Sequence, residues 1–133
     1  MGAWGTGPFE NDDALDFVAE VEEGGGKAIA AAVKAVPAKG FVEAPAGSNA
    51  LAAGEIIAAA RGRSMTDLPE EVTAWIKESA WKPKPDLIAS AASAVKRVLE
   101  STDSELRELW EEAADDDAAA WRKSVQDLLN RLI

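Results

Sequence analysis

Apolar side chains recur along this chain with the spacing of helices, and the alternating pattern of strands is not found. Residues three or four positions apart lie on one face of a helix, so such a stripe predicts a helix with one buried face. About six or seven short helices are expected, and with short connections they predict a compact all-α fold in a single domain, residues 1–133. The predicted helices cover residues 11–24, 27–36, 48–61, 69–79, 86–100, 102–110 and 115–132. The pattern leaves open whether the last two are separate helices or one kinked helix.

Several helix starts carry capping signals. Asn11 is a favoured N-cap, and Ser48 is expected to cap the third helix. Thr102 and Glu105 have the spacing of a capping box. Residues 37–47 form the longest irregular stretch, and its apolar pair Phe41 and Val42 is expected to point inward.

Residues 48–61 are apolar nearly all round, which predicts a central, buried helix. Glu55 is its one charge before Arg61. A carboxylate at such a position must be hydrogen-bonded, paired or protonated. The expected donors are Trp4 or the backbone amides of residues 5–7. Arg131, near the other end of the chain, is expected to pair with Asp127 one helical turn earlier.

The composition excludes several function classes. The chain carries 24 acidic and 14 basic residues, a net charge of −10, which disfavours nucleic acids and anionic membranes and favours basic proteins or cations as partners. It has no His and no Cys, so catalytic mechanisms that need either residue are excluded. The start lacks the features of an export signal, and no apolar stretch is long enough to span a bilayer, which predicts a cytoplasmic protein.

The glycines around Thr6 invite comparison with a phosphate-binding loop at a helix start. No lysine of the Walker type follows, and the acidic pair Asp12 and Asp13 would repel a phosphate. A tight structural turn, whose glycines permit positive φ, is the favoured interpretation.

The first predicted helix bears carboxylates on one face, among them Asp12, Asp16 and Glu20. Together with Glu55 from a neighbouring helix, such a set could ligate Mg²⁺ or Ca²⁺. The favoured interpretation is that these carboxylates are structural or solvated, and the metal site is kept as an alternative formed by Asp12, Asp16 and Glu55. The candidate binding residues are Trp4, Thr6, Asn11, Asp12, Asp16 and Glu55.

The opening of the chain resembles an uncharacterised bacterial family, domain of unknown function 4259, whose members begin with the pattern MGxWGxGxFxNDxAxDF. The resemblance extends to the Ala-rich segment around Glu55 and to the closing pattern from Ser104 to Leu132. It implies a compact bacterial cytoplasmic protein and brings no activity with it.

The sequence therefore favours a small acidic protein that acts by binding another protein, in a regulatory or immunity-type role. A binding function is favoured over an enzymatic one. The alternative is an enzyme or ligand-binding domain that uses a hard cation. A homodimer that buries the Ala-rich surface is a third option.

Overall fold

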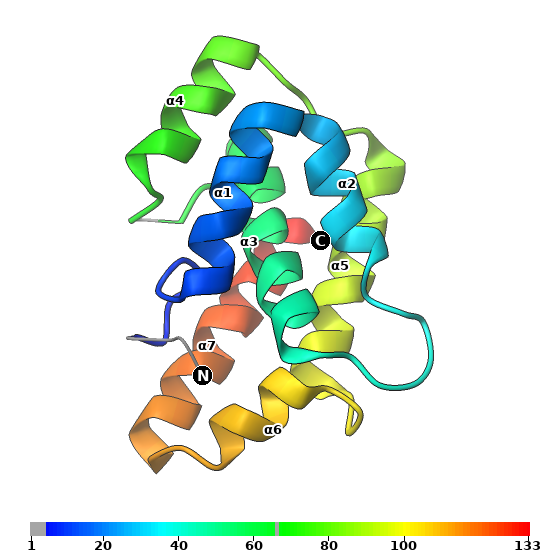
Figure 1. Cartoon of the computed structure of the whole chain (residues 1–133), viewed down its shortest axis with the longest axis vertical. Coiled ribbons are helices and arrows are strands. Elements are labelled where there is room, and N and C mark those ends of the chain that lie inside the picture. The colour runs from blue at the N-terminus through cyan, green and yellow to red at the C-terminus, as the bar shows by residue number, and fades with distance from the viewer. Residues whose placement is uncertain (1–4, 66) are drawn as a thin grey trace.

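The computed structural model describes residues 5–65 and 67–133 and confirms the all-α fold class. Within these ranges the chain forms seven helices and no strand (Figure 1). They are α1 (Asp12–Gly24), α2 (Gly26–Lys34), α3 (Ala44–Ala60), α4 (Glu70–Ser79), α5 (Pro85–Glu100), α6 (Glu105–Glu111) and α7 (Asp115–Leu132). The question left open by the periodicity is settled, because α6 and α7 are separate helices.

Helix α3 is the centre of the structure, as its apolar sequence predicts. It contacts every other helix, and Figure 1 shows it surrounded by α1, α2, α5 and α7, with α6 across one end. Most of its residues are buried, and eight of the twelve buried ones are Gly, Ala or Ser. Small side chains let neighbouring backbones approach closely, so the core forms by close contact around this helix.

Gly54 marks the closest of these approaches. A Cβ atom added there would lie 3.1 Å from Cδ2 of Leu128 on α7 and 3.2 Å from Cγ2 of Val95 on α5. Such distances are tighter than ordinary van der Waals contact, so the glycine allows the three helices to pack this closely.

We therefore expect Gly54→Ala to lower the free energy of unfolding by about 1–3 kcal/mol, because overpacking outweighs the gain in helix propensity. Urea denaturation measures the change. In a Val95→Ala background the same substitution should cost less, since the methyl group that it meets is gone. Stabilisation by Gly54→Ala alone would contradict this description of the core.

Helix α1 begins where the sequence predicts. The Asn11 side chain caps it by accepting a hydrogen bond from the Ala14 amide at 2.8 Å. Its apolar face, which includes Phe17 and Val21, is buried against the core. Its polar face is exposed and strongly acidic.

The loop before α3 is hydrogen-bonded to the connection between α5 and α6. The predicted starts of the two helices that follow these segments, α3 and α6, are wrong. Ser104, not Thr102, caps α6, since its hydroxyl accepts from the Arg107 amide. Glu105 does not close a capping box and instead accepts a hydrogen bond from the Ala44 amide at 2.7 Å. This long-range cap lets α3 begin at Ala44, four residues before Ser48, with a proline in its first turn.

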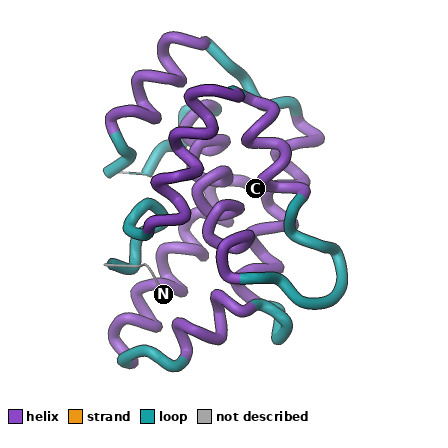
Figure 2. The backbone as a smooth tube through the Cα atoms, in the orientation of Figure 1, coloured by secondary structure: helices purple, strands orange, loops and turns teal. Residues whose placement is uncertain are grey.

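The same loop corrects one apolar prediction. Val42 is buried, and its backbone pairs with residues 103 and 105. Phe41 is 56% exposed and points away from the core. Adjacent residues of an extended segment face opposite sides, so only one of the two can point inward. Figure 2 shows this loop as the long connection between α2 and α3.

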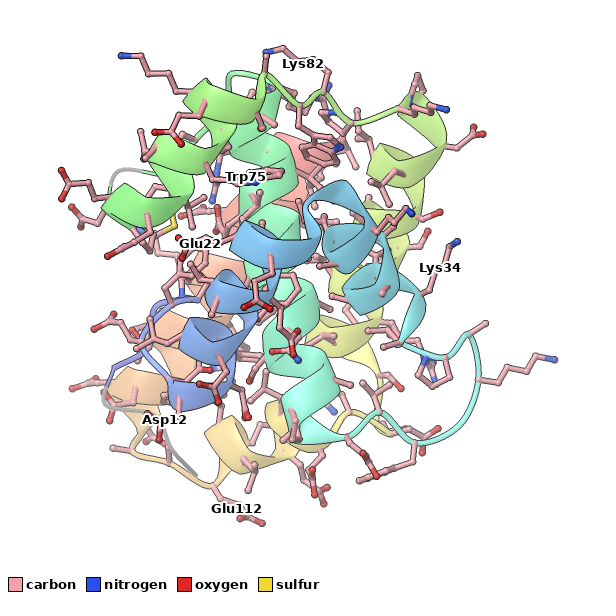
Figure 3. The ribbon with its side chains drawn as sticks, turned by 45° about the horizontal axis from the view of Figure 1, so that its top comes forward. Asp12, Glu22, Lys34, Trp75, Lys82 and Glu112 are labelled. Carbon is pink, nitrogen blue, oxygen red and sulfur yellow. The ribbon has the colours of Figure 1, made fainter. Side chains whose placement is uncertain are left out.

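Helix α4 is the most weakly attached helix, with contacts to α1 and α3. Val72 is the one buried residue of α4, and the Trp75 side chain extends from this helix toward the body of the protein (Figure 3). The Trp75 ring lies 5.7 Å from that of Trp81, with a tilt of 46° between the ring planes. Across the described ranges, no helix has the length and apolar character needed to cross a membrane.

Candidate functional site

A cavity of about 290 Å³ lies between the turn that precedes α1 and the helices α3, α6 and α7. Its position at the start of α1 is the place where the candidate residues were predicted. The polar and ionisable residues that line it are Thr6, Asn11, Asp13, Ser48, Glu55, Glu105 and Ser124. The apolar lining includes Pro8, Leu51, Leu106, Leu109, Trp110, Trp121, Val125 and Leu128.

Two tryptophans form part of the cavity wall. The rings of Trp110 on α6 and Trp121 on α7 are stacked, with centroids 6.4 Å apart and an angle of 14° between the planes. Both residues are buried. The stack joins the two helices and presents aromatic surface to the cavity.

Glu55 lies at the inner side of this cavity and is 1% exposed. Its carboxylate forms a bidentate ion pair with Arg131 of α7, with Nη1–Oε1 at 2.6 Å and Nη2–Oε2 at 3.0 Å. Among the described residues, the donor to Glu55 is thus Arg131 and not the predicted amides of residues 5–7. Trp4 itself lies outside the described residues.

Arg131 reaches Glu55 instead of pairing with Asp127 on its own helix. The bidentate geometry gives two charge-assisted hydrogen bonds in a buried setting, which one exposed pair along a helix does not match. The hydrogen bonds to Glu55 raise the pKa of Arg131 above its ordinary value, and the nearby charge of Asp127 adds to this effect. The Arg131 guanidinium is therefore positively charged over the whole pH range in which the protein is folded and studied.

Further arginine contacts fix the end of α7 beside the end of α3. Arg61 donates to the carbonyl of Leu132 at 3.0 Å, and Arg63 donates to that of Ile133 at 3.0 Å. Arg131 in turn donates to the carbonyl of Arg63 at 3.2 Å. Cations at a helix C-terminus satisfy its unpaired carbonyls and its dipole, so these contacts hold Arg131 in position.

Replacement of Arg131 by Met should lower the free energy of unfolding by about 3–5 kcal/mol, because it leaves a buried carboxylate without a partner. Arg122→Met is the matched control, since Arg122 is exposed on the same helix, and it should change stability by less than about 0.5 kcal/mol. The double variant Glu55→Leu/Arg131→Met should recover most of the loss. Urea denaturation of the four proteins tests this, and equal losses for the two arginine variants would refute the role of the pair.

The turn before α1 is closed by Glu10. Its Oε1 accepts a hydrogen bond from the Gly7 amide at 3.0 Å, and its own amide donates to the Gly7 carbonyl at 3.1 Å. Gly7 does not have a positive φ, so the turn does not use the left-handed conformation that glycine permits there. The absence of a side chain at Gly7 leaves room for the Glu10 carboxylate, since a Cβ there would lie 2.5 Å from Oε1 of Glu10. A carboxylate thus already occupies an amide that a bound phosphate would use.

The structure brings together three of the candidate binding residues, Thr6, Asn11 and Glu55, at one cavity. Asp12 and Asp16 are exposed and do not belong to its lining. Sequence reasoning missed Asp13, Glu105 and the two serines, Ser48 and Ser124. Asp13 and Glu105 resemble ordinary residues of a first helical turn, and only the packing of α6 beside α3 gives Glu105 a second role.

The predicted metal ligands are not gathered in one place. Among residues 5–65 and 67–133, no group of three or more His, Cys, Asp or Glu side chains is arranged to hold a metal ion. Both oxygens of Glu55 accept hydrogen bonds from Arg131, which leaves this carboxylate poorly placed to ligate a cation.

The family model for the domain of unknown function DUF4259 matches residues 2–124. The chain belongs to this family. The match includes the turn before α1, Glu55 and both tryptophans of the cavity wall, and it ends before Arg131. No curated protein and no solved structure matches the chain. Membership therefore establishes the family without assigning an activity.

Proposed function

We propose that this protein is a ligand-binding domain whose ligand places an apolar group in the cavity beside α1. The observation that carries the proposal is the cavity itself, with aromatic and aliphatic walls and a small number of polar groups. Its volume of about 290 Å³ is close to the lower end of the range found for small-molecule sites, about 300–1,000 Å³. The ligand is therefore small.

The serine hydroxyls support this proposal. Ser48 is 7% exposed and lines the cavity, and none of the hydrogen bonds between described residues uses its side chain. Ser124 lines the cavity from α7, and its hydroxyl is likewise unused among these residues. Ser48 is buried and Ser124 is half-buried, and both hydroxyls can exchange hydrogen bonds with a ligand or water in the cavity.

The proposal is tested by filling the cavity. A screen of small aromatic compounds by thermal shift should yield ligands that change the fluorescence of Trp110 and Trp121. Ser124→Phe should abolish their binding, because its ring occupies the cavity, whereas Gln126→Phe, at an exposed position on the same helix, should leave binding unchanged. A smaller fluorescence response in Trp121→Phe, with the thermal shift retained, locates the ligand independently of Ser124→Phe. Equal binding to both Phe variants would place the ligand elsewhere.

One observation favours a second candidate, the binding of a basic protein that is expected from the sequence. Residues 10–23 expose seven acidic side chains and no basic one, namely Glu10, Asp12, Asp13, Asp16, Glu20, Glu22 and Glu23. Figure 3 shows Asp12 and Glu112 at one end of the molecule and Lys82 at the opposite end. Such an asymmetric charge distribution steers a basic partner toward one face.

If a protein partner binds this face, Asp16→Lys/Glu20→Lys should weaken the complex and reduce its dependence on salt, because two negative charges of the face become positive. Both residues lie outside the cavity, so the variant does not alter the cavity lining. Ser124→Phe should leave the same complex intact. Cross-linking of the purified complex, followed by measurement of its affinity at two ionic strengths, separates this function from ligand binding. Light scattering of the chain alone tests for a homodimer, which would have twice the mass of one chain.

A further inference from the structure

We infer that the ligand of the cavity is a small organic cation, an ammonium group attached to an apolar body. This inference rests on the proposed ligand-binding function and names its ligand class. Of the described residues that line the cavity, the ionisable ones are Asp13, Glu55 and Glu105, and none is Lys or Arg. The described part of the cavity lining therefore carries negative charge alone.

Two of these carboxylates are available to a ligand. Glu55 is neutralised by Arg131. Asp13 and Glu105 form no ion pair with a described Lys or Arg, although one oxygen of Glu105 accepts from the Ala44 amide. Asp13 comes from the start of α1 and Glu105 from the start of α6, so two elements contribute negative charge to the same cavity. An ammonium group near both gains electrostatic energy that a neutral group lacks.

The tryptophans supply a second, independent reason. The aromatic face carries negative electrostatic potential and attracts cations, most strongly for Trp. Trp110 and Trp121 both line the cavity and are largely shielded from water. An apolar cation therefore matches the tryptophan-containing wall and the carboxylates, whereas the carboxylates repel an anion.

The cavity also favours an organic cation over a metal ion. A hard cation takes six or more oxygen ligands, and no group of three or more Asp or Glu side chains among the described residues is arranged to hold one. The hydroxyls of Ser48 and Ser124 can accept hydrogen bonds from an ammonium group, which has donors and no acceptor.

The test uses three probes of matched size and different charge: benzylamine, benzyl alcohol and benzoate. We expect benzylamine to bind the full chain at least about fivefold more tightly than benzyl alcohol, the factor that corresponds to one pair of unit charges at 4 Å in bulk water. Benzoate should bind more weakly than either. Calorimetry and tryptophan fluorescence at pH 7 measure the three affinities, and the advantage of benzylamine should decrease as salt is added.

Asp13→Asn should reduce the advantage of benzylamine and leave the affinity for benzyl alcohol unchanged. Asp12→Asn is the matched control, because Asp12 is the neighbouring carboxylate in the same helical turn and is exposed like Asp13, but does not line the cavity. Glu105→Gln, which keeps an acceptor for the Ala44 amide, should act in the same direction as Asp13→Asn.

The outcomes separate the two proposals. Equal affinities for the three probes, abolished by Ser124→Phe, would overturn the cationic ligand and keep the ligand-binding function. Equal effects of Asp12→Asn and Asp13→Asn would also overturn it, because a general change of net charge would then explain the preference. No binding of any probe would overturn both.

Discussion

The burial of α3 is the constraint on which the rest of the structure depends. A helix of mainly small residues has little side-chain area with which to form a core, so its neighbours must approach it closely. Gly54 permits this approach between α5 and α7, and Gly47 does so near Leu106 of α6. Because α3 contacts all the other helices, its small residues set the distances at which the whole fold packs.

This central helix also carries the one carboxylate that is almost fully buried. Glu55 would be costly at such a position without Arg131, and Arg131 is held by the arginine contacts that join the ends of α3 and α7. The pair thus connects packing to the cavity, since Glu55 contributes to both. A neutralised carboxylate at the inner side leaves Asp13 and Glu105 to determine the charge that a ligand meets.

The helices were predictable where capping and periodicity are local. Asn11 starts α1, the proline before Glu70 starts α4, and the acidic run at Asp115 starts α7, as their sequences indicate. The starts of α3 and α6 could not be predicted in this way, because Glu105 caps α3 from 61 positions away along the chain. The side-chain spacing of a capping box is the same whether Glu105 turns back on its own helix or reaches another.

The sequence alone determined the helical class, the central position of residues 48–61 and the need of Glu55 for a partner, because hydrophobic periodicity and the cost of a buried charge are local properties. Only the tertiary structure decided that the partner is Arg131, that Asp13 and not Asp12 or Asp16 borders the cavity, and that Phe41 stays outside. These choices depend on how helices distant in sequence pack together, and the side-chain pattern of one helix does not encode its orientation relative to another.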